Sequence, residues 1–457
     1  MLKRPILFTL FASLLLLAAC GSDSNDFSLE TPGPPPSPEA PEPDEPTALN
    51  LHIDPETAHQ RVAGFGGAVP MWTVVSTALT DEEVRTLVGS GDDQLGITLL
   101  RTIIDPDPGS WSRAAASLRE AKEYSDEVTI LATVWSPPPH MKDNNSVNNG
   151  GRLLPEYYSD FADHLNDYIA YMASEGVEID VVSPHNEPDY HPNYESAEWS
   201  GEDIRNFVRD YGDRIQARLL IGESLRFDRA YTDPSLNDPD ALANFDIVGG
   251  HLYSAEQSGT FTPYPLAEEK NKERWMTEWN FHEADGDGAP IWGDDNLDVW
   301  DETLDVVLAS VHQSMDVNWN AYIWWWMLRF YSFIGDGQSE FGTERGEVLK
   351  RGWGFSHYSL FVRPGYQRIG ADADGSDNVH ITAYRGDDDR LVAVILNRSE
   401  TSFTDVPITL PAPLSSAEGF VTSRSENRAP LAVTLDGDSL TIPTLDARSI
   451  ITVVMYP

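Results

Sequence analysis

Two glutamates occupy matched positions in this sequence. Glu187 follows the apolar, β-branched residues Val181 and Val182, and a proline comes directly after it. Glu278 also closes a short apolar run, with Trp279 after it. One such glutamate would be read as a solvated loop residue. Two in matched contexts predict a pair of carboxylates held at the ends of two buried strands, because proline ends a strand abruptly.

Paired carboxylates are the groups that glycosidic bond hydrolysis requires. One carboxylic acid protonates the leaving oxygen, and the other carboxylate attacks the anomeric carbon or activates water. We assign Glu187 as the acid/base and Glu278 as the nucleophile. Asn186 is expected to bind the sugar 2-hydroxyl, and Tyr253 is expected to hydrogen-bond Glu278. Glu223 competes for the nucleophile role but ranks lower, because the two catalytic groups should face each other.

Further residues at strand ends are expected to line the same site. Arg101 would keep the nucleophile ionised, although an ion pair with Asp105 is an equal alternative. Aromatic rings at strand ends can stack on the flat faces of sugars, although ordinary core packing is the more common role of such rings. The remaining residues expected to bind substrate are Trp72, Trp135, His251, Trp324, Trp325 and Arg329.

Metal and cofactor chemistry is not predicted. His185, His251 and His282 lack the tight spacing and the cysteine partner of a zinc site. The glycines at 64–67 lack the third spaced glycine of a dinucleotide-binding loop. The chain has 31 basic and 74 acidic residues, a formal charge of −43. This argues against binding nucleic acid or an anionic membrane through a basic surface.

The N-terminal segment resembles a bacterial lipoprotein leader. Lys3 and Arg4 precede an apolar run at 6–19, which is too short to span a bilayer. Cys20, the one cysteine in the chain, follows. We predict a signal peptide at 1–19, an acylated Cys20, and an extended Pro- and acid-rich tether at 20–48. An ordinary secretory signal is the alternative. The protein is expected to be a monomer, anchored by that lipid to the bacterial envelope at the outer membrane or cell surface.

The rest of the chain alternates strands and helices, then becomes all β. Strands are predicted at 61–66, 97–103, 128–134, 179–183, 218–222, 247–253, 275–278 and 321–326. Helices are predicted at 84–88, 112–124, 155–174, 201–214, 239–244, 265–271 and 301–315. Eight such units predict an α/β fold, a (β/α)8 TIM barrel over 61–352. Short strands predicted at 379–384, 391–396, 406–410, 432–435 and 450–454, together with residues 49–60, indicate a fused β side domain built from both ends of the folded chain.

Nine motifs, in order, resemble glycoside hydrolase family 30, and in particular the bacterial xylanases of its subfamily 8. They are residues 64–67 (GFGG), 94–96 (QLG), 135–138 (WSPP), 164–166 (HLN), 185–189 (HNEPD), 236–239 (LNDP), 250–253 (GHLY), 275–278 (WMTE) and 361–366 (FVRPGY). The resemblance implies a barrel with a β-sandwich side domain, a retaining mechanism, and xylan or xylooligosaccharides as substrate. It places Glu187 and Glu278 in the roles given above.

One departure from that family concerns the glucuronic acid branches of xylan. Members that require these branches carry an Arg before a Trp ahead of helix seven, where this chain has Val299. They also carry a Tyr two residues after the nucleophile, where this chain has Asn280. The acidic segment 280–298 would repel a carboxylate. We therefore predict a xylanase, endo or exo, that does not depend on glucuronate. The alternatives are another family 30 enzyme, such as a β-1,6-glucanase, and a non-catalytic glycan-binding lipoprotein.

Overall fold

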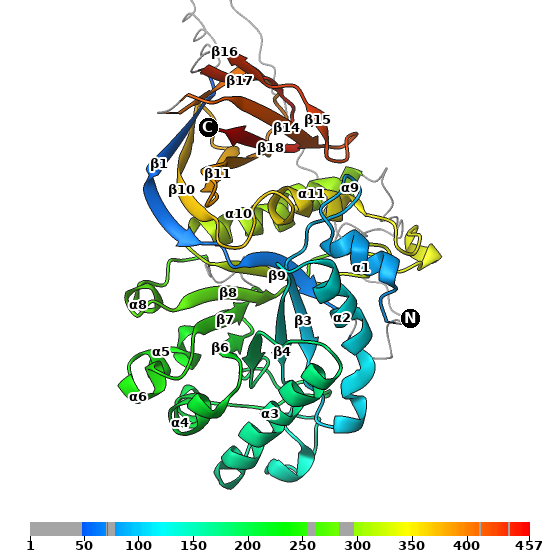
Figure 1. Cartoon of the computed structure of the whole chain (residues 1–457), viewed down its shortest axis with the longest axis vertical. Coiled ribbons are helices and arrows are strands. Elements are labelled where there is room, and N and C mark those ends of the chain that lie inside the picture. The colour runs from blue at the N-terminus through cyan, green and yellow to red at the C-terminus, as the bar shows by residue number, and fades with distance from the viewer. Residues whose placement is uncertain are drawn as a thin grey trace, which may run out of the picture. The chain divides into compact units, whose positions relative to one another are not determined.

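The computed structural model describes residues 48–69, 71, 78–253, 261–282, 297–410, 413–436 and 439–457 (Figure 1). The expected signal peptide, Cys20, the tether and Trp72 lie outside the described residues. No helix among the described residues has the length and apolar character needed to cross a membrane.

Eight parallel strands close into a barrel, which confirms the predicted fold (Figure 1). Each strand pairs with the next along the chain, and the last pairs with the first. They are β2 (Gly64–Ala68), β3 (Leu99–Ile103), β4 (Thr129–Thr133), β5 (Val181–Ser183), β6 (Arg218–Ser224), β7 (Ile247–His251), β8 (Glu273–Glu278) and β9 (Ala321–Trp326).

Helices and short turns join the barrel strands. The helices are α1 (Asp81–Val88), α2 (Ala115–Tyr124), α3 (Tyr158–Ser174), α4 (Gly201–Tyr211), α5 (Asp233–Leu236), α6 (Pro239–Leu242), α8 (Pro265–Glu269), α9 (Leu297–Glu302), α10 (Ala309–Asp316) and α11 (Lys350–Ser359). A π-helical turn, η7 (Thr303–Leu308), joins α9 to α10. The 3₁₀ turns are η1 (Pro108–Arg113), η2 (Pro139–Met141), η3 (Pro155–Tyr157), η4 (Gly212–Arg214), η5 (Arg229–Tyr231) and η8 (Ser339–Phe341).

Two helix starts follow directly from the sequence. Thr80 accepts a hydrogen bond from the backbone N–H of Glu83, whose side chain accepts from the N–H of Thr80. Ser200 and Asp203 make the same reciprocal pair at the start of α4. These capping boxes satisfy backbone donors that would otherwise lack partners.

Apolar side chains from the strands fill the barrel interior. Leu99, Leu131, Leu220 and Trp275 are among the buried residues of this interior cluster. Gly66 lets β2 approach β3, since a Cβ at this position would lie 1.7 Å from the carbonyl oxygen of Leu99. The barrel is therefore a packed core that supports polar groups only at its rim.

The remaining strands form one ten-stranded sheet with its own buried core. Strand β1 (Asn50–Arg61), from the N-terminal side of the barrel, lies inside this sheet between β10 and β13. The other strands are β10 (Gln367–Asp374), β11 (Val379–Arg385), β12 (Leu391–Asn397), β13 (Phe403–Thr409), β14 (Ser416–Thr422), β15 (Ala429–Leu431), β16 (Thr434–Asp436), β17 (Ser439–Leu445) and β18 (Ser449–Tyr456).

The boundary between barrel and sheet lies after α11, and not at Gly352 as the sequence suggested. This helix crosses residue 352. Gly352 and Gly354 allow close packing, because a Cβ at Gly352 would meet the carbonyl oxygen of Phe333 at 2.3 Å. A Cβ at Gly354 would meet Leu308 at 2.9 Å. The helix therefore completes the barrel before the sheet resumes.

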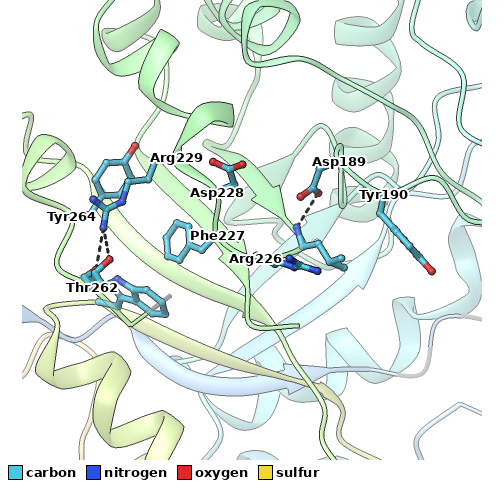
Figure 2. Close-up of a pocket in the computed structure, with 10 residues that line it drawn as sticks. Asp189, Tyr190, Arg226, Phe227, Asp228, Arg229, Thr262 and Tyr264 are labelled. Atoms are coloured by element: carbon cyan, nitrogen blue, oxygen red, sulfur yellow. Dashed lines mark hydrogen bonds between the residues drawn. The ribbon is translucent and has the colours of Figure 1, made fainter. Parts of the chain in front are cut away.

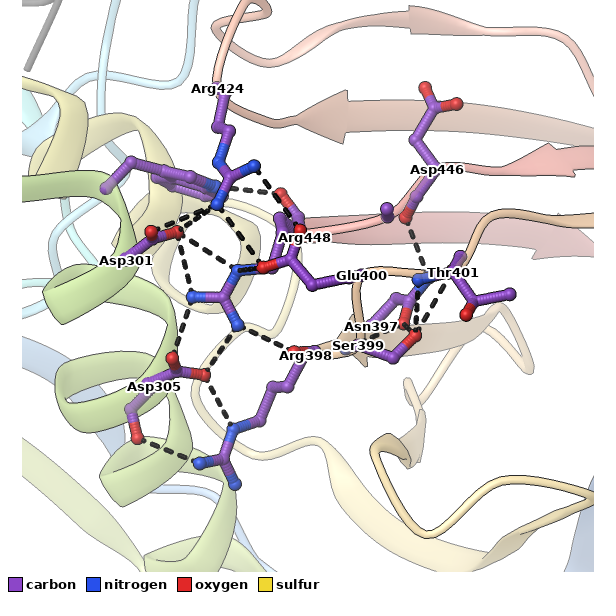
Figure 3. A network of polar contacts seen from close by, with 12 residues as sticks. Asp301, Asp305, Asn397, Arg398, Ser399, Glu400, Thr401, Arg424, Asp446 and Arg448 are labelled. Carbon is purple, nitrogen blue, oxygen red and sulfur yellow. Dashed lines mark hydrogen bonds and ion pairs between the residues drawn. The ribbon is translucent and has the colours of Figure 1, made fainter. Parts of the chain in front are cut away.

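Barrel and sheet share one apolar core and one ion-pair network. Sheet residues such as Tyr384 and Val392 belong to the same buried cluster as the barrel helices. In Figure 3, Arg448 of the sheet donates to Asp301 at 2.9 Å and to Asp305 at 2.7 Å, both on the α9–η7 helix. Arg398, Glu400 and Arg424 join the network. The two parts are thus one packed unit.

Candidate active site

The two glutamates lie at the same end of the barrel. Glu187 follows β5 and Glu278 ends β8, the fourth and seventh barrel strands, as expected. Glu187 has a φ of 43° and Glu223 a φ of 41°, both in the left-handed region. The backbone N–H of Glu187 donates to the carbonyl of Glu223 at 2.9 Å. Such backbone conformations cost about 1–3 kcal/mol each and cluster at functional sites.

The carboxylates lie close enough for nucleophilic displacement. One oxygen of Glu187, one oxygen of Glu278 and one nitrogen of His251 lie within 4.8 Å of one another. Retaining enzymes hold their carboxylates about 5–5.5 Å apart, while inverting enzymes leave about 6.5–9.5 Å for a water. The spacing here favours the retaining arrangement.

Glu187 sits in an environment suited to a general acid. Its side chain is almost fully buried, and the Nδ1 of His251 lies 3.1 Å from its Oε1. Burial raises the pKa of Glu187, and the negative charge of Glu278 adds to the rise. A raised pKa keeps a proton available for a leaving oxygen.

His251 is a buried cation between carboxylates. Burial alone would lower its pKa, but the charge of Glu278 and hydrogen bonds to Glu187 and Glu223 raise the pKa to about 9. Its Nε2 lies 3.6 Å from Oε1 of Glu223. Having no exposed surface, His251 acts on sugar only through these carboxylates.

Arg101 is likewise fully buried and joins three groups of the site. Its guanidinium lies 2.5 Å from Glu278, 2.7 Å from the amide oxygen of Asn186 and 3.0 Å from Glu223. Asp105 pairs instead with Arg113, so the alternative ion pair for Arg101 does not form. Arg101 thus positions the carboxylates and does not contact solvent.

Glu223 lies behind the site. It has no exposed surface, and Thr133 donates to its Oε2 at 3.1 Å. Burial alone would raise its pKa, but Arg101 and His251 outweigh burial and lower the pKa to about 2. A carboxylate enclosed in this way cannot reach an anomeric carbon, which favours Glu278 as the nucleophile.

A chain of hydrogen bonds leads from Glu278 to the cleft wall. The phenol of Tyr253 donates to Oε1 of Glu278 at 2.7 Å, and the amide of Asn280 donates to the phenol oxygen at 3.1 Å. Burial and the charge of Glu278 raise the pKa of Tyr253 well above its usual value, so the phenol remains a donor.

Aromatic rings line a cleft of about 920 Å³ over these carboxylates. Trp325 and Trp326 stack on each other at 5.0 Å, and Trp135 lies 6.1 Å from Trp325. Trp135 is 4% exposed, so only a small part of its indole is open to the cleft. Its ring lies over the guanidinium of Arg101 at 4.6 Å. The other lining residues are Asn148, Glu187, Tyr190, Asn193, Tyr194, Glu195, Leu225, Tyr253, Glu278 and Asn280.

Two further predicted residues, besides the buried Arg101, Asn186 and His251, do not line this cleft. Trp324 is fully buried and packs against Trp279 and Phe333. Arg329 pairs with Asp336 at 3.2 Å. Both side chains therefore support the rim of the barrel from behind.

One wall of the cleft was missed from the sequence. It is the segment after Glu187, with Tyr190 41% exposed and Tyr194 50% exposed. Lys142, almost fully buried, ties this segment to the β4 loop by donating to Ser196 O at 2.7 Å and to Ser136 Oγ at 3.0 Å. The available signal was two tyrosines in a loop directly after a catalytic carboxylate.

Two groups of side chains in the described part of the chain are spaced to hold a cation. One is Glu187, His251 and Glu278, which already neutralise one another with Arg101. The other is the exposed set His52, Asp372 and Asp374 on β1 and β10. Neither set needs a metal to account for its hydrogen bonds or charges.

Comparisons with known proteins agree with this geometry. Residues 365–453 match the family model for the glycosyl hydrolase family 30 beta sandwich domain. The chain is 33% identical over 390 residues to glucuronoxylanase XynC of Bacillus subtilis strain 168, covering 84% of this chain and 86% of that protein.

Solved structures agree as well. The family 30 subfamily 8 xylanase Xyn30A of Clostridium acetobutylicum superposes with a TM-score of 0.77 at 26% identity. A family 30 endoxylanase of Clostridium papyrosolvens C71 gives 0.74 at 28% identity. Each comparison covers 89% of this chain and 100% of the other. The chain therefore belongs to glycoside hydrolase family 30.

Proposed function

We propose that this protein is a retaining xylanase that cleaves β-1,4-xylosidic bonds. The observation that carries the proposal is the close pair Glu187 and Glu278, in a family 30 chain one third identical to a glucuronoxylanase. The partly buried tryptophans and exposed tyrosines of the cleft suit the flat faces of a xylose chain.

Hydrolysis would proceed in two displacements. Glu278 attacks the anomeric carbon while Glu187 gives its proton to the glycosidic oxygen, so the leaving sugar departs neutral and a glycosyl-enzyme ester forms. Glu187, now a carboxylate, takes a proton from water, and that water attacks the same carbon and frees Glu278. Arg101 and Tyr253 hold the nucleophile in place through both steps.

Glucuronate branches are not required in this proposal. Asn280 offers a neutral amide, already bonded to Tyr253. Val299 is 2% exposed within α9, and its side chain offers no hydrogen-bond donor to a carboxylate. Most of the acidic segment lies outside the described residues. Linear xylooligosaccharides should be cleaved. Products that all carry one glucuronate at a fixed place would contradict this.

We also propose that the mature chain is a monomer, anchored to the bacterial envelope by a lipid on Cys20. The support is the sequence alone: a basic start, a short apolar run and a single cysteine before a Pro-rich tether. Fractionation of membranes tests the anchor, and sedimentation of the purified chain tests the monomer.

The deciding experiment is hydrolysis of xylan with product analysis. Wild-type protein should release xylooligosaccharides that first appear as the β anomer by proton NMR. Glu278→Gln should be inactive, and Arg385→Gln, a charge change in the sheet, should be active. Product lengths separate endo from exo action. Release from β-1,6-glucan but not xylan would favour the alternative glucanase, and no release from either would favour a glycan-binding protein.

A further inference from the structure

A second hollow of about 710 Å³ adjoins the catalytic cleft. Tyr190 and Leu225 line both spaces, so the hollow continues the cleft past the segment that carries Glu187. In Figure 2, Tyr190, Asp189 and Arg226 lie at one end, and Arg229, Thr262 and Tyr264 lie at the other. Nothing in the proposed mechanism uses this space.

Arg226 is an unpaired cation in this hollow. It is exposed, and it makes no ion pair or hydrogen bond with any residue that the structure describes. Arg229, by contrast, donates to Thr262 at 2.6 Å and to the carbonyl of Pro263 at 2.7 Å. Its guanidinium also lies 4.6 Å over the ring of Tyr264. Arg226 is thus the guanidinium left to bind a ligand.

The acidic residues of the hollow are turned to the backbone. Asp189 accepts from the N–H of Leu225 at 2.9 Å, and Asp228 accepts from the N–H of Ala230 at 2.9 Å. The lining of the hollow thus holds two carboxylates and two guanidinium groups, whose formal charges cancel. The chain as a whole has a formal charge of −43. An anionic sugar meets a balanced surface here and not the acidic surface typical of this protein.

The hollow adjoins the segment that carries the acid Glu187, and the nucleophile Glu278 is not among its lining residues. Glu187 delivers its proton to the leaving oxygen, and Tyr190 and Leu225 lie on the Glu187 segment and directly after β6. Resting on the proposed function, we infer that Arg226 binds the carboxylate of a uronic acid branch on the leaving part of the xylan chain. Phe227 and Tyr190 offer the branch apolar faces. The contact gives a preference for branched substrate, not a requirement.

The test uses three oligosaccharides with the same backbone: unbranched, with a uronic acid branch in the leaving part, and with a neutral arabinose branch at the same place. For Arg226→Gln, the ratio of kcat/KM on the acidic branch to that on the unbranched chain should fall about two- to fivefold, the range of an exposed charge pair. The loss should lie in KM, shrink in high salt, and be partly rescued in Arg226→Lys.

Arg385→Gln is the matched control, because Arg385 ends β11 in the side sheet and also has no partner among the described residues. It should leave the ratio unchanged. An unchanged ratio in Arg226→Gln, or an equal loss on the neutral branch, would overturn the inference. Calorimetric titration measures binding of the acidic oligosaccharide directly, so it tests the inference even if the protein does not cleave xylan. If the wild type cleaves none of the three, tighter binding to wild type than to Arg226→Gln would still support the inference, and equal binding would refute it.

Discussion

Replacing His251 by Asn should make the stability of the protein less dependent on pH. The native imidazole has a pKa of about 9 against an ordinary 6.5, and it is fully buried between Glu187 and Glu223. At about 1.4 kcal/mol per unit of pKa, the raised pKa of His251 corresponds to about 3 kcal/mol of stability. Asparagine can keep a donor toward Glu187 but carries no charge.

The direction in which stability changes with pH follows from proton binding to His251. The native state holds the His251 proton more tightly than the unfolded state, so the stabilisation is complete below pH 6.5 and is lost as the pH rises through 9. Urea unfolding from about pH 5.5 to about 9.5 should therefore show the free energy of unfolding of the wild type falling relative to His251→Asn. Lys142, whose pKa is lowered to about 8, changes stability in the opposite direction but in both proteins alike.

His185→Asn is the matched control. Burial lowers the pKa of His185 to about 4, and its Nε2 accepts from the N–H of Gly222. From about pH 7.5 upward, folded and unfolded His185 are both neutral, so this variant should be destabilised by a constant amount over that part of the window. Below pH 6.5 only the unfolded His185 gains a proton, so the wild type should lose stability relative to this variant as the pH falls, the opposite direction to His251. A constant difference for His251→Asn as well would refute the view that His251 is held as a cation.

Four further outcomes are expected. Glu187→Gln should lose most activity on xylan but still release a burst of phenol from activated aryl xylosides, which do not need the proton; equal loss on both would exclude Glu187 as the acid. Tyr253→Phe should lower kcat/KM about tenfold or more, the value of a hydrogen bond to a charged group, with unchanged thermal unfolding; an unchanged kcat/KM would mean that the phenol does not support Glu278. A chain ending at Ser359 should be insoluble, because it exposes the core shared with the sheet; a soluble, active product would contradict this. Cys20→Ser should free the protein from membranes, and persistent membrane fractionation would place the anchor elsewhere.

The barrel could be predicted because parallel strands buried on both faces read as apolar runs. Helix α11 could not, since Gly352 and Gly354 are poor helix formers. Those glycines allow close packing against Phe333, in the loop after β9, and against Leu308, in η7. Neither contact can be read from the sequence around the glycines. Strand β10 was missed because its alternating residues include small alanines, which give a weak strand signal.

The two carboxylates could be located from the sequence, but most of their surroundings could not. Strict alternation in β9 would place only one of Trp325 and Trp326 in the cleft. A register shift against β2 between Gly67 and Ala68 lets both line it. Two partners of Arg101 lie on β8 and β6 and the third follows β5, and no spacing in the sequence specifies these contacts.

Trapping the glycosyl-enzyme tests the central claim most directly. Fluorine at C2 of a β-xylobioside slows both displacements, and an activated phenol leaving group restores the first, so the covalent intermediate accumulates. Mass spectrometry of the digested protein should find the xylobiosyl group on Glu278, and Glu278→Gln should carry none. A label on Glu223, or hydrolysis to the α anomer with no covalent adduct, would contradict the account.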